Sequence, residues 1–315
     1  MPPQRSRSKG LATDIIEAPG VTRVDLRWRG LVGQVAAYLV ADGADLAVID
    51  CGPGSTLDAL LRAMEAAGHD PASLTHVLVT HVHLDHAGAA GALLQAAPRA
   101  RLYVHPRGAR HLADPSRLLT SAARIYGDQM DALWGTMLPV PAERMQVLDD
   151  GDEVRVGRRV LRALDTPGHA VHHHAYHAGD LLFSGDAGGI RLGGAAYVRP
   201  PTPPPDIDVP AWRSTIARMR SLGAGRILPT HFGGAADVAW HLDDLEARLE
   251  DWTAWSAREL AAGADLATLT ERLRHKAHAE VLAAGGTEAA ALDYEAAVPS
   301  EMMAAGLLRY HQVGT

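Results

Sequence analysis

Short hydrophobic runs and one helical pattern alternate along the first half of the chain. The hydrophobic runs are four to eight residues long, which is the length of a buried or half-buried strand. A helical period occurs at residues 57–67, where Leu60 and Met64 share one face and Gly68 follows as a stop signal. We therefore expect a helix there, and strands at residues 21–28, 34–40, 45–50, 75–80 and 101–104.

The second half of the chain continues with strands and closes with helices. From about residue 235 onwards the pattern is helical throughout and rich in Ala, Leu, Glu and Arg. Mixed strands and helices followed by a helical tail indicate the α+β class, consistent with two stacked sheets flanked by helices. We expect further strands at residues 154–163, 175–177, 181–184 and 226–229, and helices at 87–97, 108–138 and 210–222.

These patterns divide the chain into three parts. Residues 1–10 are expected to form a flexible tail, and residues 11–235 one domain with a helical insertion at about 108–138. Residues 236–315 are expected to form a helical extension that packs on this domain. Six prolines at residues 198–210 exclude a strand in a sheet interior. That segment is either a rigid connector or part of the active-site lining.

Composition supports a folded protein and narrows its partners. The 315 residues are 47% hydrophobic and 21% charged, which is an ordinary globular balance. A net charge of −7 argues against a nucleic-acid surface. Cys51 is the only cysteine, so no intramolecular disulfide can form. No apolar run has the length of a signal peptide or a membrane span, so a cytoplasmic location without membrane contact is expected.

The candidate chemistry lies in a cluster of histidines and one aspartate directly after a predicted strand. The chain has 17 histidines, and the run HVHLDH at residues 81–86 contains three of them. Imidazole nitrogens and carboxylate oxygens are ligands that zinc accepts. The short loop can direct His81 and His83 to one metal ion, and Asp85 and His86 to a second.

Three further ligand-type residues follow predicted strand ends, beside small or kinked residues. His169 follows TPG, Asp186 stands in SGD, and His231 stands in PTH. This repeated placement suggests that all three converge on one rim of the sheets. His105 and His111 flank the predicted insertion, where surface or helix-capping roles are expected.

Taken in order, the runs HVHLDH, TPGH, SGD and THFG resemble the metallo-β-lactamase superfamily, most closely its glyoxalase-II-like and lactonase-like hydrolases. The resemblance covers about residues 35–231 and implies an αββα sandwich with two divalent metal ions, most commonly zinc, with iron or manganese as alternatives. It implies that Asp186 and a hydroxide bridge the two ions. The remaining implied ligands are His81, His83 and His169 for one ion, and Asp85, His86 and His231 for the other.

The resemblance also suggests supporting roles around the metal ions. Asp50 and His173 would orient the ligands from outside, although His172 stands where the family frequently has glycine. Asp85 is a candidate for proton transfer, and Tyr197 is a candidate for contact with the substrate. Cys51 is expected to be a small buried residue rather than a nucleophile.

The function implied is hydrolysis of a small acyl compound, such as a thioester, a lactone or a related ester. The metal-bridging hydroxide would attack the acyl carbon. The alternatives are a single-iron persulfide dioxygenase, a phosphodiesterase acting on nucleic acid, and a β-lactam hydrolase. We expect a small-molecule substrate and no nucleic acid, and the apolar faces of the helical tail either close the pocket or pair two chains as a homodimer.

Overall fold

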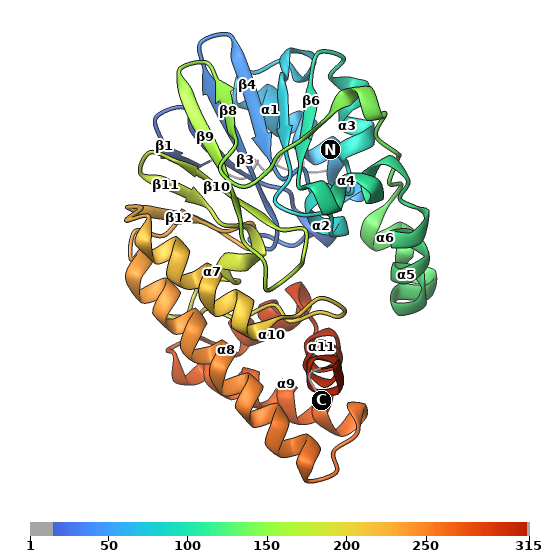
Figure 1. The fold of residues 1–315 in the computed structure, drawn as a ribbon, viewed down its shortest axis with the longest axis vertical. Helices are drawn as coiled ribbons and strands as arrows, with labels where there is room; N and C mark the ends of the chain where they lie inside the picture. The colour runs from blue at the N-terminus through green and yellow to red at the C-terminus, as the bar shows by residue number, and fades with distance from the viewer. Residues whose placement is uncertain (1–14, 314–315) are drawn as a thin grey trace, which may run out of the picture.

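Two β-sheets stacked face to face form the centre of the molecule, and helices cover their outer faces (Figure 1). The computed structural model describes residues 15–313, so the predicted tail at residues 1–10 lies outside the described residues. The arrangement confirms the α+β sandwich that the sequence predicted.

The first sheet has seven strands, which lie side by side in chain order. Strands β1 to β4 pair antiparallel, whereas β4 to β7 pair parallel and therefore need helical crossovers between them. The short strands β1 and β7 were not predicted. The strands are β1 (Ile15–Ala18), β2 (Val21–Asp25), β3 (Ala36–Asp42), β4 (Asp45–Ile49), β5 (His76–Leu78), β6 (Arg101–Val104) and β7 (Met145–Val147).

The second sheet has five strands in the order β12-β11-β10-β9-β8. Only β11 and β12 pair parallel, and helix α7 (Val209–Ser221) lies between them in the chain. The strands are β8 (Glu153–Val156), β9 (Arg159–Asp165), β10 (His174–Ala178), β11 (Leu181–Phe183) and β12 (Arg226–Leu228).

Side chains along each strand of the first sheet point alternately to its two faces, and both faces are covered by apolar residues. On β3, Tyr38 and Val40 point into the cluster between the sheets, whereas Ala37 and Leu39 face the helices outside. The inter-sheet cluster also takes Tyr176 and other residues of the second sheet. Burial on both faces explains why these strands are nearly continuous hydrophobic runs.

The strand predicted at residues 21–28 ends early, at Asp25. Its carboxylate accepts hydrogen bonds from the backbone N–H of Arg27 at 3.0 Å and of Gly33 at 2.9 Å. Arg27 has a positive φ of 52°, so the chain turns there instead of extending.

Three helices replace the single helical insertion predicted at residues 108–138. Gly127 and Gly135, with φ of 53° and 63°, end two of them, a conformation that favours glycine. These helices lie on one flank of the first sheet (Figure 1). The helices before α7 are α1 (Leu57–Ala66), α2 (Leu84–Ala87), α3 (Ala90–Ala96), α4 (Pro106–Ala113), α5 (Ser116–Tyr126) and α6 (Met130–Trp134).

The helical tail packs on the second sheet. Leu245 and Leu249 of α8 share an apolar cluster with Leu182 of β11 and Trp212 of α7. No helix in residues 15–313 is long and apolar enough to cross a membrane. The tail consists of α8 (Val238–Ala261), α9 (Leu266–Ala283), α10 (Glu288–Ala297) and α11 (Ser300–Val313).

Candidate metal centre

The histidine run forms the turn between β5 and α2. His81 and His83 lie in the turn itself, whereas Asp85 and His86 lie on the first turn of α2. Position 88, just after this helix, requires glycine because a Cβ there would come within 2.3 Å of the Leu84 carbonyl oxygen. The four polar side chains are thus fixed by a strand end on one side and a tightly packed helix on the other.

Three imidazoles of this region direct one nitrogen each to a common point. His81 Nε2 lies 2.8 Å from His83 Nδ1, and His169 Nε2 lies 3.3 Å and 3.2 Å from these two atoms. His169 Nδ1 donates to the carbonyl of Pro201, so its Nε2 presents a lone pair. Lone pairs that face one another across a buried gap fit a cation between them.

A second group contains Asp85, His86 and His231, whose ligand atoms lie within 4.8 Å of one another. His231 Nε2 is 3.2 Å from Asp85 Oδ2. Its Nδ1 donates to the Gln34 carbonyl at 2.8 Å, which again leaves the lone pair pointing inward.

Asp186 lies between the two groups. Its Oδ1 is 3.2 Å from His86 Nε2, and its Oδ2 is 3.5 Å from His169 Nε2. Asp186 Oδ1, His86 Nε2 and His231 Nε2 are buried and have no hydrogen-bond partner in the described part of the chain. Leaving such atoms unsatisfied costs about 1–3 kcal/mol each, a cost that a bound cation would remove. The residues present therefore fit divalent metal ions.

Asp50 ties the ends of three strands beneath the ligands. Its buried carboxylate accepts from His86 Nδ1 at 2.8 Å, from the backbone N–H of Thr80 at 2.7 Å and from Thr230 Oγ1 at 2.6 Å. The carboxylate fixes the His86 tautomer, with the proton on Nδ1 and the lone pair on Nε2. Through this bond Asp50 would orient His86, which is the role that the resemblance implies for it.

Burial and neighbouring charges shift the pKa values of His83 and Asp85. Burial lowers the pKa of His83 to about 3, so this imidazole is a neutral ligand. Burial opposes ionisation of Asp85, yet His86 and His231 lower the pKa of its carboxyl to about 2. Asp85 Oδ2 lies 3.2 Å from His231 Nε2 within the second group of ligand atoms, and this geometry favours a ligand role over proton transfer.

The sequence model of the metallo-β-lactamase superfamily matches residues 30–231, which is more than half of the chain. The chain belongs to the metallo-β-lactamase superfamily. The resemblance predicted from the sequence is confirmed, and the described residues contain groups of His and Asp side chains that could hold metal ions.

This chain matches each of the following curated relatives over less than two thirds of that relative's length. A metallo-β-lactamase fold-containing protein of Sulfurisphaera tokodaii is 29% identical over 152 residues, which cover 47% of this chain and 57% of that protein. A hydroxyacylglutathione hydrolase of Aeromonas hydrophila is 34% identical over 113 residues, 36% of this chain and 33% of that enzyme. An atrochrysone carboxyl ACP thioesterase of Aspergillus fumigatus is 26% identical over 219 residues, 68% and 42% respectively.

Solved structures share the fold over nearly the whole chain. A metallo-β-lactamase family protein from Thermus thermophilus superposes with a TM-score of 0.67 at 21% identity, over 94% of both chains. A β-lactamase domain protein from Burkholderia ambifaria gives a TM-score of 0.64 at 19% identity, over 96% of this chain and 89% of that chain. Coverage this high includes most of the helical tail, which no sequence motif had matched.

The two histidines after the TPGH motif, His172 and His173, have different surroundings. His173 Nδ1 lies 2.8 Å from Thr166 Oγ1, and His173 Nε2 accepts from the backbone N–H of Ala187 at 3.3 Å. It therefore holds the loop that carries Asp186. The ring of His172 lies 5.7 Å from the ring of His83, and its buried Nδ1 has no partner among the described residues.

Tyr197 packs into the helical tail. Its hydroxyl donates to Glu280 of α9 at 3.3 Å, and its ring meets Tyr294 of α10 edge-on at 5.0 Å. The side chain is fully buried. No contact with a metal-ligating residue is found for Tyr197 in residues 15–313, so the substrate contact proposed for it has no structural support.

The proline-rich segment connects the tail to a candidate ligand. The Pro201 carbonyl holds His169, and the Thr202 hydroxyl donates to the Met303 carbonyl of α11 at 3.2 Å. Gly306 packs so closely that a Cβ would come within 1.9 Å of the Thr202 carbonyl oxygen. The segment therefore supports the metal centre instead of only connecting two elements. The sequence shows no signal for a backbone carbonyl in this role.

A second group of metal-type residues lies outside this centre and was not predicted as a group. It contains His105, Asp165 and His174, whose ligand atoms also lie within 4.8 Å of one another. His105 Nδ1 caps α4 by accepting from the backbone N–H of Arg107 at 3.0 Å. Its proton is therefore on Nε2, which points to Asp165 Oδ1 at 3.2 Å. This imidazole offers no lone pair to a cation.

Proposed function

We propose that this hydrolase cleaves small acyl thioesters at two divalent metal ions, with zinc the preferred metal. His81, His83 and His169 would hold one ion, and Asp85, His86 and His231 the other. The observation that carries the proposal is Asp186, which directs one carboxylate oxygen to each group, at 3.2 Å from His86 and 3.5 Å from His169.

When bound, such a pair of ions lowers the pKa of a water and polarises an acyl carbonyl. The chain's own residues supply the rest. Asp50, Pro201 and Gln34 accept the outward ring protons of three histidines, which keeps the inward lone pairs in place. Five of the proposed ligands are buried, which excludes bulk water around them: His81, His86, His169, Asp186 and His231.

Thioesters are the favoured substrates because of the relatives. The hydroxyacylglutathione hydrolase of Aeromonas hydrophila and the carboxyl ACP thioesterase of Aspergillus fumigatus are both named for thioester cleavage. A thioester carbonyl is also more electrophilic than that of an ordinary ester. Lactones and other activated esters are the next substrates to test.

Metal analysis followed by a substrate screen tests this proposal. The purified protein is analysed by inductively coupled plasma mass spectrometry and then assayed on thioesters, lactones and a phosphodiester. About two zinc ions per chain and thioesterase activity lost on chelation support it. A single iron ion with oxygen consumption on persulfides would overturn it, and so would cleavage of the phosphodiester alone.

A further inference from the structure

One face of helix α5 presents two exposed arginines. Arg117 and Arg124 are both exposed, and neither forms a hydrogen bond or ion pair with another residue in the described range. By contrast, Arg213 and Arg220 on α7 are both paired with carboxylates. The guanidinium groups of Arg117 and Arg124 are therefore available to an anion from outside the chain.

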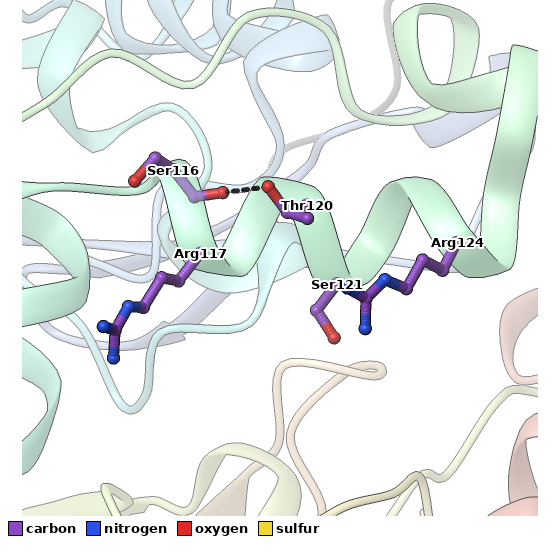
Figure 2. A pocket seen from close by; sticks show the side chains of 5 residues that line it. All are labelled: Ser116, Arg117, Thr120, Ser121 and Arg124. Carbon is purple, nitrogen blue, oxygen red and sulfur yellow. Dashed lines mark hydrogen bonds between the residues drawn. The ribbon is translucent and has the colours of Figure 1, made fainter.

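The two arginines and three hydroxyls line one open hollow of 240 Å³. Figure 2 shows Arg117, Ser121 and Arg124 on the same side of the helix, with Thr120 bonded back to Ser116. Seven residues of helix separate the arginines, which places their Cα atoms about 10 Å apart along the axis. The hollow is thus lined by two guanidinium groups and by the hydroxyl groups of serine and threonine.

Helix α5 packs against α4, which borders the metal centre. Just before it, His111 of α4 lies 6.2 Å from the ring of His172, whose ring lies 5.7 Å from that of His83. The start of α5 is therefore next to a helix that reaches the histidines around the metal centre.

We propose that Arg117 and Arg124 bind the anionic groups of the thiol carrier to which the acyl substrate is attached. This inference rests on the proposed thioesterase function and adds the substrate class to it. Guanidinium groups bind phosphates and carboxylates through paired, charge-assisted hydrogen bonds. Two such groups spaced along a helix suit a flexible carrier with more than one negative charge. Phosphates and carboxylates share this chemistry.

Matched thioesters that differ only in the carrier test the inference. One acyl group is supplied on coenzyme A, on glutathione and on neutral N-acetylcysteamine, and kcat and KM are measured for each. The test variant is Arg117→Gln/Arg124→Gln. The control variant, Arg62→Gln/Arg258→Gln, removes the same charge from exposed arginines on α1 and α8.

The test variant should raise KM for a charged thioester roughly tenfold, the effect of one charge-assisted hydrogen bond. The kcat, the KM for the neutral thioester and the melting temperature should not change, and the control variant should behave as wild type. An effect on the coenzyme A thioester alone identifies a phosphate carrier, and one on the glutathione thioester alone a carboxylate carrier. Unchanged KM values, or an equal rise for the neutral thioester, overturn the inference.

Direct binding separates this inference from the proposed function. Titration of free coenzyme A and free glutathione into the protein should show binding that the test variant and added salt both weaken. If wild type hydrolyses no thioester, not even the neutral one, the proposed function fails. If the neutral thioester is cleaved but neither carrier binds, only the inference about α5 fails.

Discussion

The two groups of histidine and aspartate in this molecule look alike by distance and differ in chemistry. Both bring ligand atoms within 4.8 Å of one another. In the metal centre, the outward nitrogens of His86, His169 and His231 donate to oxygen atoms. In the second group, His105 Nδ1 accepts a hydrogen bond from the backbone N–H of Arg107. The partner of the second nitrogen, and not proximity, decides whether an imidazole can bind a cation.

The second group fits a structural role. His105 follows β6 of the first sheet, whereas Asp165 ends β9 and His174 begins β10 of the second sheet. The hydrogen bond from His105 Nε2 to Asp165 therefore joins the two sheets at one edge. Substitutions in each group should separate metal binding from fold stability.

Asp186→Ala should have the largest effect. Loss of the carboxylate removes the residue that lies between both groups, so metal content and activity should fall together. The loss of activity should exceed the 10- to 100-fold typical of a residue that only orients a ligand. Metal content and kcat/KM are measured on the same preparation. Full metal binding in this variant would show that Asp186 does not bridge the two sites.

Asp50→Asn should weaken metal binding about 10- to 100-fold. The amide group places a donor among three donors, from His86, Thr80 and Thr230, and the tautomer of His86 is no longer fixed. Zinc affinity is measured by competition with a chelator, with Asp58→Asn on exposed helix α1 as control. Equal affinities of the two variants would remove the orienting role of Asp50.

Gly306→Ala tests the support that the tail gives to His169. The new Cβ would meet the Thr202 carbonyl oxygen, displacing the segment that holds Pro201. We expect a loss of about 1–3 kcal/mol in the free energy of unfolding, together with weaker zinc binding. Gly193→Ala is the control because its Cβ would meet nothing within 4 Å. Unfolding is followed in urea, and a destabilised variant with unchanged zinc affinity would separate the tail from the metal centre.

His105→Ala should have the smallest effect and should spare the metal ions. The variant loses the cap of α4 and the bond to Asp165, which costs about 1 kcal/mol of stability. His105→Asn keeps a capping group and should recover part of that loss. Urea unfolding and metal analysis check both variants. Loss of a metal ion from either variant would show that the group around His105 also takes part in metal binding.

The sequence could bring the candidate ligands together because each one stands in a local motif at a strand end. Strand ends of stacked sheets meet at one edge, so His81, His169 and His231 could be brought together without knowledge of the packing. The sequence could not show the partners of their outward nitrogens. Two of these partners are backbone carbonyls, at Gln34 and Pro201, which carry no side-chain signal.

The remaining differences come from side-chain contacts, local and tertiary, that the hydrophobic pattern does not show. The hydrophobic run after Val21 stops as a strand at Asp25 because the carboxylate binds the following backbone. Tyr197 follows the Asp186 motif in the chain, yet the tail helices enclose it. Asp165 is ordinary in sequence and meets His105 only through the stacking of the two sheets.

Metal stoichiometry of variants in the two groups tests most directly whether the group around Asp186, and not the group around His105, binds metal ions. Wild type, Asp186→Ala and His105→Ala are equilibrated with zinc, passed through a desalting column and analysed by inductively coupled plasma mass spectrometry. We expect about two ions per chain in wild type and in His105→Ala, and a clear loss in Asp186→Ala. Retention of both ions by Asp186→Ala, with loss of an ion from His105→Ala, would contradict it.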